Sequence, residues 1–199
     1  MCIRNLLTPI LCAGVMLAGC ATAPPYTKSE FLGANFDSRA VTEVAVVPVL
    51  DIRVDKSEAL ELDAWVHVPA KRLMGMRGYK VTTFADRALI SALQALPTRE
   101  AIEAEVKDFA IPNGPRHVLV FGLVDAYSKM TFGSTGNAEM VGYLIDQQRR
   151  EVVWRNQAVG QIGQGGVIGM FMKGLMARSA IEGATMKLVY SIPPREEPK

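Results

Sequence analysis

The amino-acid sequence predicts a single α/β domain in which helices flank a mixed β-sheet, with elements in the order β-α-β-α-α-β-β-β-α. Two short apolar runs, Val44–Leu50 and His117–Val124, are rich in β-branched residues and have the length of strands buried on both faces. Segments with helical spacing lie between them, an alternation that places helices against a sheet. Two later segments mix apolar with polar residues, which is typical of antiparallel strands with one wetter face.

The first helix is expected over Ser57–Met76, after the strand Val44–Leu50. Its apolar positions near helical spacing are Leu60, Ala64, Val68 and Leu73. Gly78 should end this helix, because glycine adopts the conformation that follows a helix end. Pro69 should kink or split it, because proline lacks a backbone N–H and crowds the preceding turn.

The middle of the chain predicts one strand and two helices. Tyr79–Phe84 alternates as a strand does, and it is followed by helical segments over Arg87–Leu96 and Thr98–Phe109. Proline separates the two helices at position 97, and Thr98 has the side chain of a helix N-cap.

The last part of the chain predicts three strands and a helix. His117–Val124 is the most apolar strand segment. Asn137–Asp146 and Glu151–Ile162 should pair as an antiparallel hairpin through Gln147–Arg150. A final helix should begin near residue 167 or 175 and end near Val189.

The N-terminus has the features of a secretory signal. Arg4 precedes an apolar stretch over Leu6–Leu17, which is shorter than a membrane-spanning helix requires. The residues Leu17, Ala18, Gly19 and Cys20 resemble the lipobox of bacterial lipoproteins, in which the cysteine is lipidated after cleavage. Several acyl chains on one cysteine would hold the protein durably at a membrane.

The expected organisation is therefore a signal peptide over 1–19, a lipidated Cys20 with a tether over 20–40, an α/β domain over 41–190 and a disordered tail over 191–199. Pro24 and Pro25 fit a tether, and the tail contains no large apolar side chain after Ile192. In Gram-negative lipoproteins a residue other than Asp after the lipidated cysteine favours the outer membrane. Ala21 and Thr22 therefore predict the outer membrane, with the domain facing the periplasm.

Composition excludes several classes of function. The formal charge is +2, and lysine and arginine form no basic stripe, so nucleic acid is not an expected partner. The three cysteines are Cys2, Cys12 and Cys20, so the mature domain would have no free thiol for a disulfide or a redox site.

The order of elements and several short motifs resemble a family of uncharacterised Gram-negative lipoproteins of the surface-antigen type. The motifs are the strand Val44–Leu50, the turn Gly78-Tyr79, Leu144-Ile145-Asp146 and Val153-Trp154-Arg155. The layout is also similar to the periplasmic domain of the curli secretion lipoprotein and to the amino-terminal domain of the Tol propeller protein. This resemblance implies a protein that binds other proteins or assembles, without catalysis or a cofactor.

No residue pattern predicts a catalytic or metal site. His67 and His117 are far apart and belong to no HExxH pattern, and no GxSxG frame surrounds Ser128, Ser134 or Ser179. Four carboxylates near strand ends could converge on a ligand, although solvated turn residues are the commoner outcome. They are Asp51, Asp55, Asp125 and Asp146.

The glycine-rich stretch Gly160–Gly169 lacks the residues of a phosphate-binding loop. The apolar segment Gly165–Met176 is instead a candidate contact for a partner or a membrane. Its expected contact residues are Gly165, Gly166, Val167, Ile168, Met170, Phe171 and Met172. The pairs Met74/Met76 and Met170/Met172 could bind Cu(I), but methionine more often fills cores.

We therefore expect an outer-membrane lipoprotein that acts, without catalysis or a cofactor, as an interaction or assembly component of a cell-envelope complex. Other envelope lipoproteins, secretion factors or further copies of the chain would be its partners. One alternative is a pore or secretion subunit whose 163–176 loop enters the membrane in an oligomer. A second is a binder of small ligands.

Overall fold

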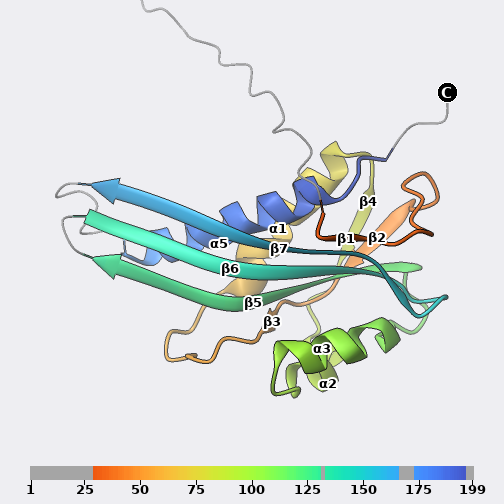
Figure 1. Ribbon diagram of the computed structural model, residues 1–199, viewed down its shortest axis with the longest axis horizontal. Coiled ribbons are helices and arrows are strands. Elements are labelled where there is room, and N and C mark those ends of the chain that lie inside the picture. The colour runs from red at the N-terminus through yellow and green to blue at the C-terminus, as the bar shows by residue number, and fades with distance from the viewer. Residues whose placement is uncertain (1–28, 131–132, 166–172, 196–199) are drawn as a thin grey trace, which may run out of the picture.

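The computed structural model describes residues 29–130, 133–165 and 173–195, and they form one mixed α/β domain (Figure 1). The seven-stranded sheet has the order β1-β7-β6-β5-β2-β4, with β3 paired beside β2 on β5. The strands are β1 Phe31–Leu32, β2 Glu43–Val46, β3 Leu50–Asp51, β4 Lys80–Thr83, β5 His117–Met130, β6 Gly133–Asp146 and β7 Glu151–Gly165. Strands β2, β3, β4 and β5 pair in parallel, whereas β5, β6, β7 and β1 pair antiparallel, so the predicted mixed sheet is confirmed.

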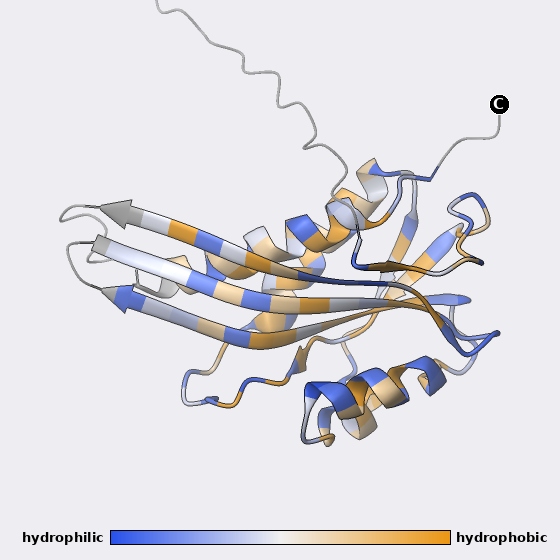
Figure 2. Ribbon diagram, viewed as in Figure 1, coloured by the Kyte–Doolittle hydropathy of each residue, from blue (hydrophilic) through white to orange (hydrophobic). Residues whose placement is uncertain are grey.

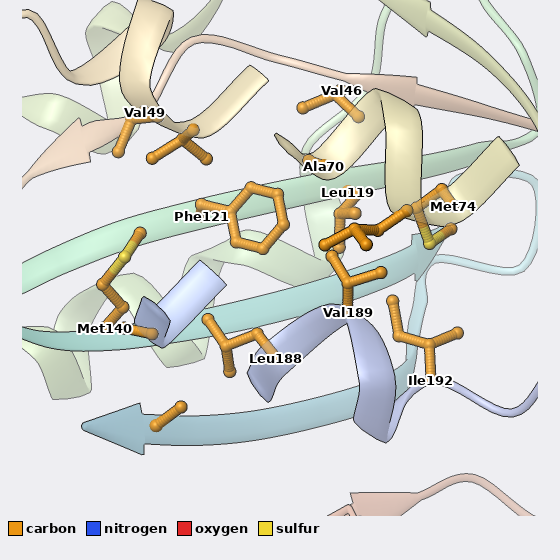
Figure 3. Packing of buried hydrophobic residues seen from close by; sticks show 14 of the residues in the cluster. Val46, Val49, Ala70, Met74, Leu119, Phe121, Met140, Leu188, Val189 and Ile192 are labelled. Carbon is orange, nitrogen blue, oxygen red and sulfur yellow. The ribbon is translucent and has the colours of Figure 1, made fainter. Parts of the chain in front are cut away.

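Helices cover both faces of the sheet. The helical segments are α1 Leu62–Met76, η1 Arg87–Ile90, α2 Ser91–Gln94, α3 Arg99–Glu105, η2 Val106–Asp108 and α5 Lys173–Ser191. One core lies between the sheet and the pair α1 and α5, where Phe121, Met74 and Leu188 meet (Figure 3). A second core lies under α2 and α3, around Ile102 and Tyr143. Along the described residues, no helix is both long and apolar enough to cross a bilayer.

The predicted strand Val44–Leu50 is interrupted, which corrects the expectation of one continuous strand. Proline at position 48 has no N–H for the sheet, and the chain leaves the ladder between β2 and β3. Side chains bind the backbone there: Val49 N–H donates to Asp63 Oδ1 at 2.7 Å, and Arg87 Nη2 donates to the Val49 carbonyl at 3.1 Å. The interruption is therefore stabilised without a neighbouring strand.

Helix α1 begins at Leu62, later than the expected Ser57, and continues through Pro69 without being split. Gly78 follows the helix end with a φ of 87°, as predicted. Thr98 caps α3 as predicted, because its Oγ1 accepts a hydrogen bond from the Ala101 N–H at 3.2 Å.

Two expected boundaries differ in the structure. Phe31–Leu32, expected in the tether, forms β1 and pairs with β7. Helix α5 extends to Ser191, and the fully buried Ile192 lies in the core beside α1, so this part of the expected tail belongs to the domain. Arg195 N–H donates to the Arg77 carbonyl at 2.9 Å. The packed chain thus extends to residue 195.

Helix α5 lies almost directly on the backbone of β6 and β7. A Cβ at Gly160 would be 1.8 Å from the Ala180 carbonyl oxygen, and a Cβ at Gly136 would be 2.3 Å from the Met176 carbonyl oxygen. No side chain fits at these distances, so glycine is required at both positions.

Replacing Gly160 by alanine should lower the free energy of unfolding by about 3 kcal/mol, because the methyl group would push α5 off the sheet. The matched control is Gly163→Ala in the same strand, where a Cβ would meet only Thr135 Cγ2 at an ordinary 3.6 Å. It should change stability by no more than about 0.5 kcal/mol. Urea denaturation followed by circular dichroism measures both, and equal effects would contradict the close contact.

Candidate interaction surface

The most distinctive surface is a three-stranded ribbon that continues beyond the parallel part of the sheet. Strand β5 pairs with β2 and β3 no further than Leu123, and a β-bulge at position 124 precedes Asp125. From there β5, β6 and β7 continue together (Figure 1). We call residues 125–130, 133–139 and 157–165 the distal ribbon.

One face of the distal ribbon is closed by α5. Four small ribbon residues lie on this face: Gly136, Ala138, Ala158 and Gly160. They lie against Met176, Ala180 and Ala184, which α5 buries. This packing holds the ribbon against the helix.

The other face of the distal ribbon is open, because side chains alternate between the faces of a sheet. Tyr127 is 40% exposed there, and Lys129 Nζ lies 5.0 Å from the centre of its ring. A shallow pocket of about 390 Å³ lies at this part of the ribbon. Its lining residues are Tyr127, Lys129, Thr135, Gly136, Asn137, Gln161, Ile162 and Gly163.

The open face is polar but not uniformly charged. Hydropathy colouring shows mixed blue, white and orange along the ribbon. Strong orange lies where helices cover the rest of the sheet, which we call the inner sheet (Figure 2). Asp125 lies directly opposite Glu139, and Gln157 Nε2 donates to Glu139 Oε1 at 2.5 Å. An aromatic ring surrounded by amides and hydroxyls is suited to contact with another protein, where tyrosine is enriched.

Within the described part of the chain, the outer edge of β7 is open along most of its length. Among the described residues, no strand pairs with β7 beyond Arg155, where β1 ends the ladder. The Val153 carbonyl accepts from Gly33 N–H, and the Val159 carbonyl accepts from Lys187 Nζ at 2.7 Å. Because these groups face away from β6, the alternate residues 157, 161 and 163 also direct their backbone N–H and C=O groups outward.

The other sheet edges carry features that disfavour pairing with a further strand. The outer edge of β5 beyond the bulge carries Asp125 and Lys129, and β4 is only four residues long with Lys80 at its start. Charges, bulges and short strands are the devices that prevent strands from pairing at an edge. Strand β7 carries no charged residue and no proline between Asn156 and Gly165.

A second pocket, of about 340 Å³, lies between α3 and the sheet near β1. Its centre is Glu103, whose Oε1 accepts from Tyr143 Oη at 3.2 Å and whose Oε2 lies 3.3 Å from Arg155 Nη1. Burial and the Glu103 charge raise the pKa of Tyr143. Phe31 and Val152 line the same pocket. The contacts of Glu103 with Tyr143 and Arg155 join α3 to the sheet, and this pocket is the location for the small-ligand alternative.

The four strand-end carboxylates do not converge. Asp51 ends β3 and pairs with Arg53 at 2.8 Å, and Asp55 is exposed in the loop that follows. Asp125 lies on the open face, whereas Asp146 lies at the opposite end of the sheet, where it pairs with His117 across β5 and β6. The sequence hypothesis of a shared carboxylate site therefore has no support in their positions.

Asp146 organises the turn between β6 and β7. Its side chain is 2% exposed, its Oδ2 accepts from Arg116 Nε at 2.9 Å, and its Oδ1 accepts from the Gln148 N–H at 3.1 Å. Burial alone would raise the pKa of Asp146, but the hydrogen bonds from Arg116 and from the Arg149 backbone outweigh it and lower the pKa. The neighbouring His117 is 6% exposed, and burial lowers its pKa.

The remaining candidate residues have structural positions or lie outside the described residues. His67 Nε2 is 3.0 Å from the Val47 carbonyl, and Met74 is fully buried in the core, so neither is free for a ligand. Within residues 29–130, 133–165 and 173–195, no group of three or more His, Cys, Asp and Glu side chains is placed to hold a metal ion. Leu17, Ala18, Gly19 and Cys20 lie outside these ranges.

The 163–176 segment is not one loop, which corrects the sequence expectation. Gly163–Gly165 ends β7 and Lys173–Met176 begins α5. The contact residues Gly166, Val167, Ile168, Met170, Phe171 and Met172 lie outside the described residues. Sequence reasoning missed the length of the ribbon, although Asp125-Ala126-Tyr127-Ser128-Lys129 continues the alternation expected of a strand.

Known proteins resemble the chain only distantly. No protein-family model matches it, and no curated protein matches it. Among solved structures, it is similar to the PelC dodecamer from Paraburkholderia phytofirmans, with a TM-score of 0.44 and 18% identity over 81% of this chain and 93% of that chain. It is similar to lipoprotein GNA1162 from Neisseria meningitidis, with a TM-score of 0.41 and 16% identity over 62% of this chain and 84% of that chain.

A minor lipoprotein from Acinetobacter baumannii has a TM-score of 0.43 and 6% identity over 77% of this chain and 93% of its own. GNA1162 and the Acinetobacter baumannii protein are bacterial lipoproteins. At such scores and identities, the likeness carries no argument about function. The finer resemblance to the curli secretion and Tol proteins stays an expectation.

Replacing Asp146 by asparagine should lower the free energy of unfolding at pH 7 by about 1–3 kcal/mol, because Arg116 loses its ionised partner. A carboxylate whose folded pKa is lowered stabilises the fold fully above its unfolded pKa, and this contribution is lost as the pH falls through the folded pKa. The difference between wild type and variant should therefore shrink below pH ~4. Urea titrations at several pH values measure it, with the exposed Asp125→Asn as the control expected to differ by less than about 0.5 kcal/mol.

Proposed function

We propose that this chain is a lipoprotein anchored through Cys20 to the outer membrane, with its domain facing the periplasm. The lipobox residues Leu17, Ala18 and Gly19 support this proposal, together with the apolar run before them. In this proposal the domain is a non-enzymatic interaction or assembly component of a cell-envelope complex. Its partners are other envelope lipoproteins, secretion factors or copies of the same chain.

The observation that carries the proposal is the distal ribbon, which has a covered face and an open one. A ribbon that only completed the fold would need neither an exposed Tyr127 nor a β7 edge that no described strand pairs with beyond Arg155. Both features favour contact with another protein over chemistry at a closed site.

A pore subunit is the second candidate, favoured by strand length. Strands β5, β6 and β7 have 14, 14 and 15 residues, which exceeds the roughly 9 to 11 that a membrane-spanning strand needs. Against it, the open face carries Asp125, Lys129 and Glu139, which lipid would not accept, and α5 covers the other face. A large ring of subunits in detergent would favour the pore.

A photo-reactive residue placed at Tyr127 or Asn137 should cross-link to a defined envelope protein in living cells, because both positions lie at the open face. The matched control is Ala88, which is exposed on η1 far along the chain from the ribbon. Cross-links from Ala88 and from the ribbon to the same set of proteins would contradict a specific surface. Mass spectrometry of the cross-linked bands identifies the partners.

Replacing Cys20 by serine should abolish incorporation of radiolabelled palmitate and release the protein from the outer-membrane fraction of a sucrose gradient. Serine offers no thiol for the acyl chains that hold the protein at the membrane. Cys12→Ser is the matched control, because that cysteine lies in the apolar part of the signal and should leave labelling unchanged. Labelled, membrane-bound Cys20→Ser protein would refute the anchor.

A further inference from the structure

The open edge of β7 has the properties of a pairing site for another strand. The residues whose backbone groups face outward are Gln157, Val159, Gln161 and Gly163. Two exposed apolar side chains belong to this strand, Val159 at 36% and Ile162 at 37%. An edge that is long, uncharged and partly apolar pairs readily with another strand unless something covers it.

We propose that a second copy of this chain covers it, with β7 pairing antiparallel to the β7 of that copy across a two-fold axis at Gln161. The inference rests on the proposed function, because it names a partner for the distal ribbon. A two-fold dimer is the commonest assembly of identical chains, and it brings the same edge of each copy together. The three strands of each ribbon would then form one six-stranded antiparallel sheet.

The centre of the pairing follows from the length of the open edge. Phe31 occupies the edge at Arg155, so the free segment runs from Gln157 to Gly165, and its midpoint is Gln161. Because the Gln161 backbone groups face outward, two such residues can exchange both of their hydrogen bonds across the axis.

Side chains fit this register. Each Val159 lies opposite Gly163 of the other copy, and each Ile162 lies opposite Gly160, so both apolar side chains meet a glycine. The segment between Asn156 and Gly165 contains no charged residue, so no two like charges would face each other across the axis. The exposed parts of Val159 and Ile162 would lose water on pairing, which favours association.

Two features of this chain compete for the edge. Lys187 Nζ donates to the Val159 carbonyl at 2.7 Å, and pairing would replace that exposed contact with a backbone hydrogen bond. The segment before β1 could also extend along β7. In the register of β1, however, Pro25 would lie opposite Gln161 with no N–H to donate, which disfavours this occupant.

The test uses the mature protein extracted from membranes in mild detergent, with its mass measured by light scattering after size exclusion and corrected for detergent. Wild type should have the mass of two chains. Gln161→Lys and Gln161→Glu should each have the mass of one chain, because the axis places two like charges in contact. An equal mixture of the two variants should return to the mass of two chains, because opposite charges then meet.

The Gln161 side chain is exposed on the open face, so neither substitution should disturb the fold, and circular dichroism checks this. Gln148→Lys is the matched control, because Gln148 is exposed in the β6–β7 turn at the opposite end of β7, and it should stay dimeric. Each substitution at Gln161 should raise the dissociation constant of the dimer at least tenfold, and the mixture should reverse it.

A monomeric wild type, a larger ring, or variants of Gln161 that remain dimeric would each overturn the proposal. A mixture that stays monomeric would overturn the register at Gln161. Slow hydrogen exchange of the outward-facing amides at positions 157, 159, 161 and 163 in a monomeric wild type would assign the edge to the chain's own N-terminal segment. Cross-links from Tyr127 to another envelope protein would still support the proposed function in that case, so the two failures are distinguishable.

Discussion

The contact between α5 and the backbone of β6 and β7 determines what the rest of the sheet can do. At Gly136 and Gly160 the helix is so close that a single methyl group has no space. Helix α5 thus supports the distal ribbon from one side, whereas α1, α2 and α3 cover the rest of the sheet (Figure 1). A three-stranded ribbon without this support would be only marginally ordered in water. Helix α5 therefore keeps the open face and the open edge of the ribbon in a fixed position.

Polar interactions stabilise the places where the backbone leaves the sheet. After β2, the carboxylate of Asp63 and the guanidinium of Arg87 bind the Val49 N–H and carbonyl that no strand reaches. At the other end, Asp146 binds Arg116 and the turn. Both carboxylates replace hydrogen bonds that burial would otherwise leave unmade, which would be costly. The side chains of Asp63, Arg87, Arg116 and Asp146 thus have structural roles.

The inner sheet could be predicted from the sequence because burial on both faces leaves a continuous apolar run, as in Val44–Val46 and His117–Leu123. The break at Pro48 was missed, because the run stays apolar while the hydrogen-bonding partner changes from a strand to side chains. The strands of the distal ribbon were predicted to be shorter than they are, for a different reason. Gly136 and Gly160 weaken any strand signal in the sequence, yet α5 requires them there, a contact distant in sequence. Whether the edge of a strand is open depends on which other strands lie beside it, so a local sequence pattern does not predict it.

The early start of the folded domain limits where the molecule can go. With Cys20 as the proposed anchor, the ~9 residues up to Ser29 reach at most ~30 Å even when fully extended. Each domain would therefore stay within a thin layer beside the bilayer, free to diffuse in two dimensions but not to leave. Confinement of this kind raises the local concentration of identical chains, as a short linker does for two joined modules. At the same number of copies per cell, a chain that is anchored in this way would therefore be paired more completely than the same chain without an anchor.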